Sequence, residues 1–373
     1  MQLHLDLPSR TQVDELVTSR HPVSVSIYLA TDPAGDGQAE RIELRNLADE
    51  ALRQLRAAGH DKRALGALEE LLQDLQDDTL LWTYLARSLA VFVTPGHIAT
   101  FRLPTALASA VEVSDRFHVT PLMRALSFPQ AAYVLALSQN AVRVLEVLPA
   151  GPPQLVAVPD LPRDAVDAVA VPSISGRQPH GRVEGGEGRK MRLGQFSRAV
   201  DQALRPLLAG QSLPLVLSAA RPLDDIYRQW NSYPHLAEKT IEGNPETLTD
   251  VELAAAARTV IDAINAEALA ALHDQVEERA NEGRAAYDVA EVARAATYGM
   301  VDTLVVDLDA AVAGAVDEAS GAVTFAESAD AESYGVLDEI ARRVWLSGGR
   351  VLAVRRADVP RGGDVAAILR WSL

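Results

Sequence analysis

The chain has 373 residues and contains no cysteine, which excludes disulfides, thiolate nucleophiles and thiolate metal sites. Its formal net charge of −16 opposes unspecific binding to nucleic acid, because the summed field of the protein repels phosphate. The length suggests two or three domains, and 48% hydrophobic with 23% charged residues is typical of a globular protein.

The sequence carries no membrane or export signal. No apolar run approaches the roughly 20 residues that are needed to span a bilayer. The amino terminus lacks a basic region followed by an apolar stretch, which a secretory signal would have. We therefore expect a cytoplasmic protein with no membrane partner.

The first 125 residues predict an α/β domain, because segments of helical spacing alternate with short β-branched runs. The stretch SDRFHVTPL at its end holds Asp115, Arg116 and His118, and we interpret it as a packed interdomain turn. The predicted elements are a helix after Ser9 or Thr11, a strand over residues 23–29, helices over 40–58 and 62–76, and two strands that turn at Pro95 and Gly96.

Residues 126–248 predict a second α/β domain. AAYVLALS and AVRVLEVL form a β-hairpin with its turn at Gln139 and Asn140, and QLVAV follows as a third strand. Periodicity then disappears from about residue 159 to residue 190, and it resumes at Met191 with an amphipathic helix. LPLVLSAA is predicted as a buried strand and PLDDIYRQW as a short helix.

Residues 249–373 predict a third domain. Thr249 and Glu252 form a capping box for a long helix that ends near residue 278. Strands are expected at VDTLVVDLD, AVTFAE, RVLAVRR and VAAILRW, with a helix over YGVLDEIARRVWL before a glycine stop. This pattern indicates a small α/β sandwich with the last strand inside its sheet, so the whole chain is of mixed α/β class.

The stretch HGRVEGGEGRK, residues 180–190, is glycine-rich and basic within an acidic chain. Residues 177–198 hold six Lys or Arg against two Glu, and cations in a first helical turn oppose the helix dipole. A partner rich in phosphate explains this placement; an ordinary solvated loop is the alternative. The candidate RNA-binding residues are Arg177, His180, Arg182, Arg189, Lys190 and Arg192.

Other familiar chemistry is not supported. The stretch fails the P-loop pattern, since no Ser or Thr follows Lys190, and it lacks the spacing GxGxxG. No HxxxH, HxH or GxSxG pattern occurs, so we expect no metal, no cofactor and no hydrolytic triad. Asp302, Asp307 and Asp309 are interpreted as strand ends and caps rather than metal ligands. The four tryptophans are interpreted as core residues, namely Trp82, Trp230, Trp345 and Trp371.

Several segments occur in an order that resembles archaeal and eukaryotic class I release factors and Pelota. They are VSVSIYLATDP, AAYVLALSQNAVRVLEV, the basic loop with its glycine pair, ATYGMVDTLVVD and the closing GGRVLAVRRADVPRGGDVAAILRW. The chain looks most like their bacterial relatives, the archaeo-eukaryotic release-factor-like families that include Balon-type ribosome hibernation factors. GGDVAAILRW is the most telling segment, since release factors end on a similar glycine pair and strand.

The resemblance implies three domains: residues 1–125 reach the decoding centre, residues 126–248 have a ribonuclease-H-like fold, and residues 249–373 resemble RNA-binding ribosomal proteins. It also implies that the basic loop enters the peptidyl-transferase centre, where release factors carry Gly-Gly-Gln. Here Gly185 and Gly186 match the glycine pair, and Glu187 stands at the glutamine position. A carboxylate suits neither nearby phosphates nor a developing oxyanion, which argues against hydrolysis.

Our leading hypothesis is therefore a ribosome-binding factor that occupies the A site in hibernation or stress protection and catalyses nothing. Its expected partners are rRNA and tRNA of the ribosome, with a translational GTPase as a further candidate, and not DNA. The alternative is a release or rescue factor that hydrolyses peptidyl-tRNA through Gly185, Gly186 and Glu187. A nuclease is disfavoured, because the first two strands of the middle domain supply Glu146 as their one carboxylate.

Overall fold

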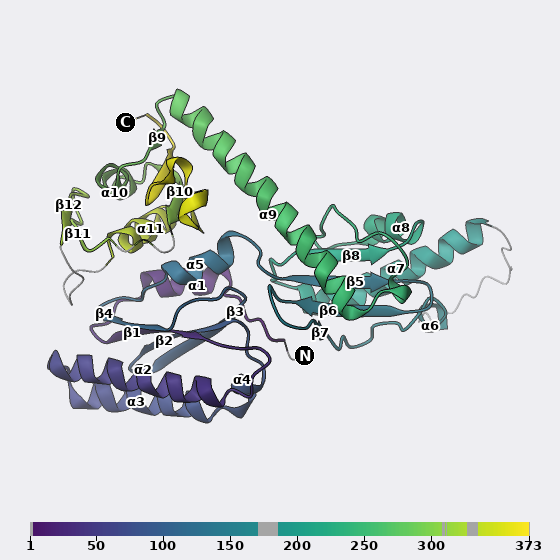
Figure 1. Ribbon diagram of the computed structural model, residues 1–373, viewed down its shortest axis with the longest axis horizontal. Coiled ribbons are helices and arrows are strands. Elements are labelled where there is room, and N and C mark those ends of the chain that lie inside the picture. Colours follow the sequence, from purple (N-terminus) through teal and green to yellow (C-terminus); the bar gives the residue numbers. More distant parts are fainter. Residues whose placement is uncertain (1–2, 171–185, 308–309, 311, 327–334, 373) are drawn as a thin grey trace, which may run out of the picture. The chain divides into compact units, whose positions relative to one another are not determined.

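The computed structural model describes residues 3–170, 186–307, 310, 312–326 and 335–372. The chain divides into two compact units: a middle unit, Pro129–Ile264 with the residues before His4, and an outer unit, His4–Phe128 with Asn265–Leu373. Both units contain helices packed with β-sheet, which confirms the mixed α/β class (Figure 1). The division into three domains stays a prediction.

The middle unit is built on a four-stranded sheet of order β7-β6-β5-β8. β5 and β6 form the predicted hairpin, with Leu137 paired to Val142 across the turn, and β8 joins β5 in parallel. A parallel pair needs a crossover, which here contains a long helix, α7. The strands are β5 (Ala132–Leu137), β6 (Val142–Val147), β7 (Gln154–Leu155) and β8 (Leu215–Ala219).

Helices cover both faces of this sheet. One face buries Val134, Leu145 and Val216 against the first half of α9, where Leu253 and Ala257 are fully buried. On the other side, α7 packs against α8, and α8 packs against β8. The helices are α6 (Asp167–Ala170), α7 (Gly186–Leu208), α8 (Leu223–Trp230), η1 (Pro245–Thr247) and α9 (Asp250–Asn281), whose second half belongs to the outer unit.

The amino-terminal part of the outer unit is an antiparallel sheet of order β3-β2-β1-β4. Its two faces alternate along β1: Val25, Ile27 and Leu29 pack against α2 and α3, whereas Tyr28 packs on the opposite side. The elements are α1 (Arg10–Thr18), β1 (Ser24–Ala30), α2 (Gln38–Ala57), α3 (Lys62–Asp77), α4 (Thr79–Thr83), β2 (Ser88–Thr94), β3 (His97–Leu103), β4 (Ala110–Ser114) and α5 (Thr120–Ser127).

The carboxyl-terminal part is a second sheet of order β13-β10-β14-β9. The last strand, β14, lies between β10 and β9, as predicted from VAAILRW. The elements are β9 (Ala285–Ala286), α10 (Val289–Thr297), β10 (Val301–Asp307), β11 (Gly314–Val316), β12 (Val323–Phe325), α11 (Val336–Leu346), β13 (Arg350–Val354), η2 (Arg356–Asp358), η3 (Pro360–Gly362) and β14 (Val365–Leu369).

The two parts of the outer unit share one core. Buried residues of β1, β2 and α5 belong to the same cluster as buried residues of α10, α11 and β10. Polar contacts reinforce this packing: the Trp345 indole donates to Asp14 over 2.6 Å, and the backbone N–H of Ala353 donates to Ser127 over 2.9 Å. The first 125 residues and the last hundred are therefore packed as one body.

A buried carboxylate lies at the centre of this contact. Glu339 of α11 accepts hydrogen bonds from Arg116 over 2.8 Å, from Arg342 over 2.6 Å and from Arg343 over 2.8 Å. Its side chain is 1% exposed. Burial opposes the ionised form of Glu339, but the hydrogen bonds from Arg342 and Arg343 outweigh it, and the pKa lies below its ordinary 4.5. Of the turn predicted to be packed between domains, Arg116 and His118 contact α11, whereas Asp115 is exposed, and the interdomain position stays a prediction.

Some elements differ from the sequence predictions. The strand β4 and the helix α10 were not predicted, since AVEVS is short and partly exposed and α10 is only nine residues long. QLVAV forms two residues of strand rather than five. Trp82 is 2% exposed, as predicted for core, but Trp371 at 52% and Trp230 at 44% are not core residues. Trp230 is the last residue of α8 and Trp371 follows β14, so both lie where the chain leaves the interior.

None of the helices in the described residues combines the length and the apolar character that crossing a bilayer requires.

Candidate functional site

The most basic element of the middle unit is α7, which is anchored by one apolar face. Its buried side chains recur every three or four residues, the spacing of one helical face. Because that face is buried, the opposite side of the helix faces solvent. The buried residues are Leu193, Phe196, Val200, Leu204 and Leu207.

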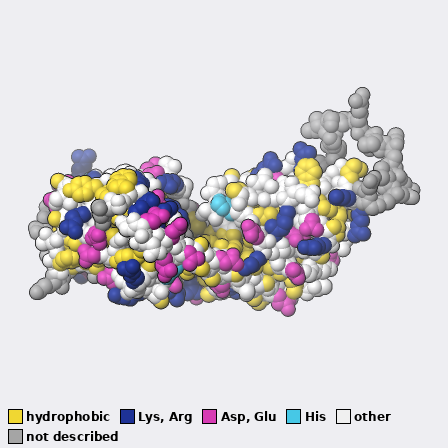
Figure 2. Space-filling model, turned by 90° about the horizontal axis from the view of Figure 1, so that it is seen from above, with side chains coloured by type: hydrophobic (Ala, Val, Ile, Leu, Met, Phe, Trp, Pro, Cys, Tyr) yellow, Lys and Arg dark blue, Asp and Glu magenta, His cyan; other side chains and the backbone are white. Residues whose placement is uncertain are grey.

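The first two turns of α7 present cations to solvent. Arg189, Lys190 and Arg192 are exposed, and no carboxylate of the described residues forms an ion pair with any of them. The helix begins at Gly186 rather than near Met191 as predicted, because Arg, Lys and Met extend a helix readily once its apolar face is held. Lys and Arg side chains are spread over the face of the middle unit seen in Figure 2.

The other predicted site residues are placed only in part. Gly186 and Glu187 are the first two residues of α7. Arg177, His180, Arg182 and Gly185 lie outside the described residues. The predicted roles of all these residues therefore remain predictions, and Arg189, Lys190 and Arg192 are the three whose surroundings can be analysed.

One glycine of α7 allows a close approach of α8. A Cβ at Gly194 would lie 3.2 Å from Nε1 of Trp230, which is tighter than an ordinary contact. The guanidinium of Arg198 lies over the same indole, 5.7 Å from the ring centroid. Trp230 thus stacks on the outside of the α7–α8 pair instead of filling a core.

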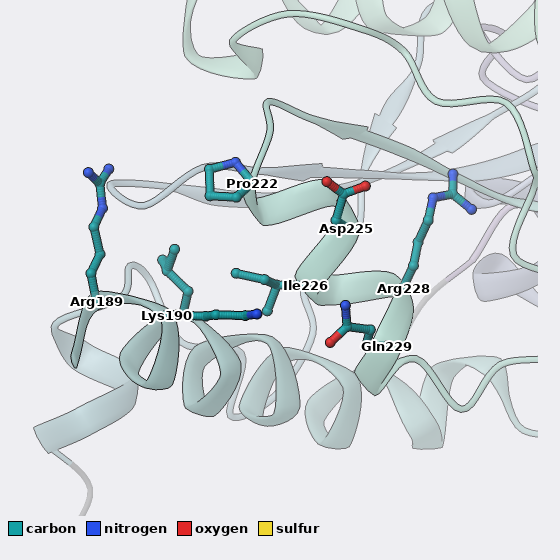
Figure 3. A pocket seen from close by; sticks show the side chains of 8 residues that line it. Arg189, Lys190, Pro222, Asp225, Ile226, Arg228 and Gln229 are labelled. Carbon is teal, nitrogen blue, oxygen red and sulfur yellow. The ribbon is translucent and has the colours of Figure 1, made fainter. Parts of the chain in front are cut away.

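A cavity of about 750 Å³ lies between the start of α7 and α8. Figure 3 shows its lining from both helices: Ile226 and Gln229 of α8 point toward α7, and Lys190 of α7 extends beneath Ile226. Asp225 and Arg228 project from the other side of α8. The complete lining is Arg189, Lys190, Leu193, Pro222, Asp225, Ile226, Arg228 and Gln229.

A second cavity, of about 730 Å³, lies on the far side of α8 and shares Asp225 and Arg228 with the first. Its lining is more acidic, and its cations are paired. Arg228 donates to Asp224 over 2.9 Å and to the Ala237 carbonyl over 3.0 Å. Arg228 is therefore a structural cation that holds the chain after α8, rather than one free to bind a ligand.

The interior of the middle unit holds carboxylates that are already partnered. Asp201 of α7 is 3% exposed and accepts hydrogen bonds from Arg205 over 2.9 Å and from the backbone of Ser232 over 2.8 Å. Burial and the nearby Asp201 carboxylate raise the pKa of Tyr227. Glu146 of β6 is 1% exposed. These buried groups are poorly placed to hold catalytic metal ions in contact with a substrate.

Metal binding finds no support in the part of the chain that the structure describes. No three His, Cys, Asp or Glu residues of that part are grouped so as to hold an ion. Asp302 and Asp307 are the first and last carboxylates of β10, and Asp309 lies outside the described residues.

The middle unit matches a known family. Residues 129–267 match the model of bacterial archaeo-eukaryotic release factor family 11. This range begins with the residue that opens the middle unit and includes both α7 and α8. The resemblance to the bacterial archaeo-eukaryotic release-factor-like family is thereby confirmed, through this part of the chain. Comparison with curated proteins gave no match.

Solved structures give similar but distant matches. The archaeal translation termination factor aRF1 is 15% identical, with 98% of this chain and 99% of that chain covered and a TM-score of 0.26. Dom34 of S. cerevisiae is 12% identical, with 77% and 81% covered and a TM-score of 0.43. A ribosome-bound archaeal Pelota is 15% identical, with 77% and 78% covered and a TM-score of 0.39.

Proposed function

We propose that the chain is a ribosome-binding factor that occupies the A site, protects ribosomes in hibernation or stress, and catalyses no reaction. The observation that carries this proposal is the exposed pair Arg189 and Lys190 at the start of α7, in a unit that matches a release-factor family model. The factor would act in the cytoplasm, where the ribosomes are.

Charge supports a local mode of RNA binding. The whole chain has a net charge of −16, so phosphate is repelled from most of its surface. The cations at the start of α7 project from a helix whose apolar face is buried, which holds their backbone positions fixed. An acidic body with one cationic element favours a single docking orientation on an RNA-walled site over unspecific RNA binding.

The absence of catalysis rests on Glu187. At the position where the family resemblance puts glutamine, its carboxylate would repel phosphates and the oxyanion that forms during ester hydrolysis. The second candidate function, peptidyl-tRNA hydrolysis through Gly185, Gly186 and Glu187, is favoured by the glycine pair, since a backbone N–H at residue 187 could still orient water.

Binding and release can be measured on one ribosome preparation. We expect the wild-type chain to cosediment with vacant ribosomes at about 50 mM salt and less at about 200 mM salt, because phosphate contacts weaken as salt rises. We expect no release of labelled peptide from a stalled complex. If the chain cosediments at neither salt concentration, the proposal is wrong.

Two variants separate the two candidate functions. If Glu187→Gln gains peptide release, the chain has the fold of a release factor but lacks the glutamine that release requires. If the wild type releases peptide and the change of Gly185 and Gly186 to alanine abolishes that release, the chain is a hydrolase. A translational GTPase is a further proposed partner, supported if its addition with GTP raises the fraction of chain bound to ribosomes.

A further inference from the structure

The cavity between α7 and α8 combines three kinds of lining in one place. Arg189 and Lys190 supply two cations that no described carboxylate neutralises. Pro222 supplies an exposed apolar surface, and the buried side chains of Leu193 and Ile226 close the apolar floor beneath the cavity. Gln229 adds an amide that can both donate and accept hydrogen bonds. The cavity volume of about 750 Å³ falls within the usual range for small-ligand sites.

Two faces of α8 differ in charge. Ile226 and Gln229, three residues apart, share the face toward α7, whereas Asp225 and Arg228 share another (Figure 3). The Asp225 carboxylate lies 4.0 Å from Arg221, and Arg228 is held by Asp224 and by backbone carbonyls. The side of the cavity that faces α7 therefore has unpaired positive charge beside apolar surface.

We propose that this cavity binds one unpaired nucleotide of RNA, with its phosphate at Arg189 and Lys190 and its base on Pro222, above the buried Leu193 and Ile226. Gln229 would contact the edge of the base. This inference rests on the proposed ribosome binding and identifies the part of the RNA that the middle unit holds. Phosphate suits the two cations because it offers several acceptor oxygens, and a flat base can lie on apolar side chains.

An unpaired nucleotide fits the lining better than the alternatives do. A base pair in a helix cannot place its face on a protein surface, whereas an unstacked base can. An acidic peptide would satisfy the cations but would leave the apolar floor without a flat partner. Free inorganic phosphate would likewise use only Arg189 and Lys190.

The test measures, by fluorescence anisotropy, the binding of a fluorescein-labelled hexauridylate to the full chain at about 50 mM salt. The variants are Lys190→Gln and Gln229→Glu, each with a matched control in the middle unit. Arg163→Gln removes an exposed cation and Gln195→Glu adds an exposed carboxylate, and neither residue lines the cavity. Competition by UMP and by inorganic phosphate measures the contribution of the base.

We expect Lys190→Gln and Gln229→Glu each to weaken binding about fivefold to tenfold. Lys190→Gln removes a charged contact with the phosphate, and Gln229→Glu places a carboxylate in the cavity that would bind the nucleotide. Their matched controls should change it less than about twofold, the effect of a distant charge. UMP should compete at a lower concentration than phosphate. Cosedimentation with ribosomes, measured on the same variants, reports the proposed function separately.

Three outcomes would overturn the proposal. Equal losses for Lys190→Gln and Arg163→Gln would mean that surface charge binds RNA without the cavity. Equal competition by UMP and phosphate would mean an anion site without a base contact, and no binding up to about 1 mM chain would mean no site. In each case cosedimentation of the wild type could persist, whereas its loss would remove the proposed function itself.

Discussion

Basic side chains have different surroundings in the outer and middle units. In the outer unit, Arg116, Arg342 and Arg343 surround Glu339, whose side chain is 1% exposed. In the middle unit, Arg189 and Lys190 are exposed at the start of α7 and pair with no described carboxylate. A cation that is buried beside a carboxylate stabilises the fold, whereas an exposed cation without a carboxylate partner is available to bind a ligand.

This difference separates stability from binding. Removing one partner of a buried ion pair leaves an uncompensated charge in the interior, which is strongly destabilising. Removing an exposed cation near the start of a helix leaves no buried charge and costs little folding energy. The two regions should therefore respond to neutralisation in opposite ways, and four experiments test this.

The largest effect is expected for Glu339→Gln. The change leaves three guanidinium groups around a neutral amide, so the outer unit should lose about 3–5 kcal/mol of its free energy of unfolding. Hydrogen exchange of the α11 amides measures this locally, since exchange reports the opening of each unit separately. An exposed carboxylate of α3 supplies the control: Glu70→Gln should change stability by less than about 0.5 kcal/mol. Equal effects of the two changes would refute a structural role for the cluster.

The next effect concerns binding. Changing Arg189 and Lys190 together to glutamine should weaken ribosome binding about tenfold to a hundredfold and reduce the slope of log affinity against log salt by about 1.4–1.8, if each cation neutralises one phosphate. The thermal stability of the chain should stay equal or rise slightly. Cosedimentation over a series of salt concentrations measures both quantities.

The matched control for this pair is Lys62 with Arg63. These residues are likewise a Lys and an Arg, exposed near the start of a helix, α3 of the outer unit. Their change to glutamine alters the net charge by the same amount. A similar loss of ribosome binding in both double variants would show that total charge matters and that the position on α7 does not.

A smaller effect is expected for Arg143 of β6, which ties the start of α9 to the sheet of the middle unit. Its guanidinium donates to Asp250, to the Pro245 carbonyl over 2.8 Å and to the Leu248 carbonyl over 3.0 Å. Because water can reach this side chain, Arg143→Met should cost about 1–2 kcal/mol, less than a fully buried charged hydrogen bond. Hydrogen exchange of the middle-unit amides in a series of urea concentrations measures this loss of unfolding free energy. Arg192→Met, at an exposed residue of the same unit, should cost nearly nothing.

The smallest effect is a pH dependence of the outer unit. Burial disfavours charged His118, but Asp338, 2.8 Å from its Nδ1, outweighs this, and the pKa of His118 lies above its ordinary 6.5. Its contribution to stability should therefore be complete below pH 6.5 and be lost as the pH rises through the raised value. The loss should stay below about 1 kcal/mol, since both side chains are partly exposed.

Unfolding of the wild type and of His118→Asn at pH 5.5 and pH 8.5 tests this dependence, in a range where Glu339 stays ionised. The wild type should be the more stable at the lower pH by a margin that the variant lacks. An identical pH dependence of the two proteins would exclude His118 as its source.

Much of the fold could be predicted from local pattern. The hairpin of β5 and β6 follows from two apolar runs around Gln139 and Asn140, and the start of α9 from Thr249 and Glu252, which form both hydrogen bonds of a capping box. The exposure of Arg189 and Lys190 followed from their place before an apolar helical face. Such features depend on residues within a few positions of one another, where periodicity and capping act directly.

The sequence by itself determined the mixed α/β class, most helices and strands, and the cationic start of α7. Tertiary structure alone decided which cations are used for folding, because Arg116 and Glu339 lie 223 positions apart in the chain. It also decided that Pro222, Ile226 and Gln229 meet Lys190 across one cavity. Local pattern fixes which side of an element is apolar, but the partner of a side chain depends on contacts that form only when distant segments pack.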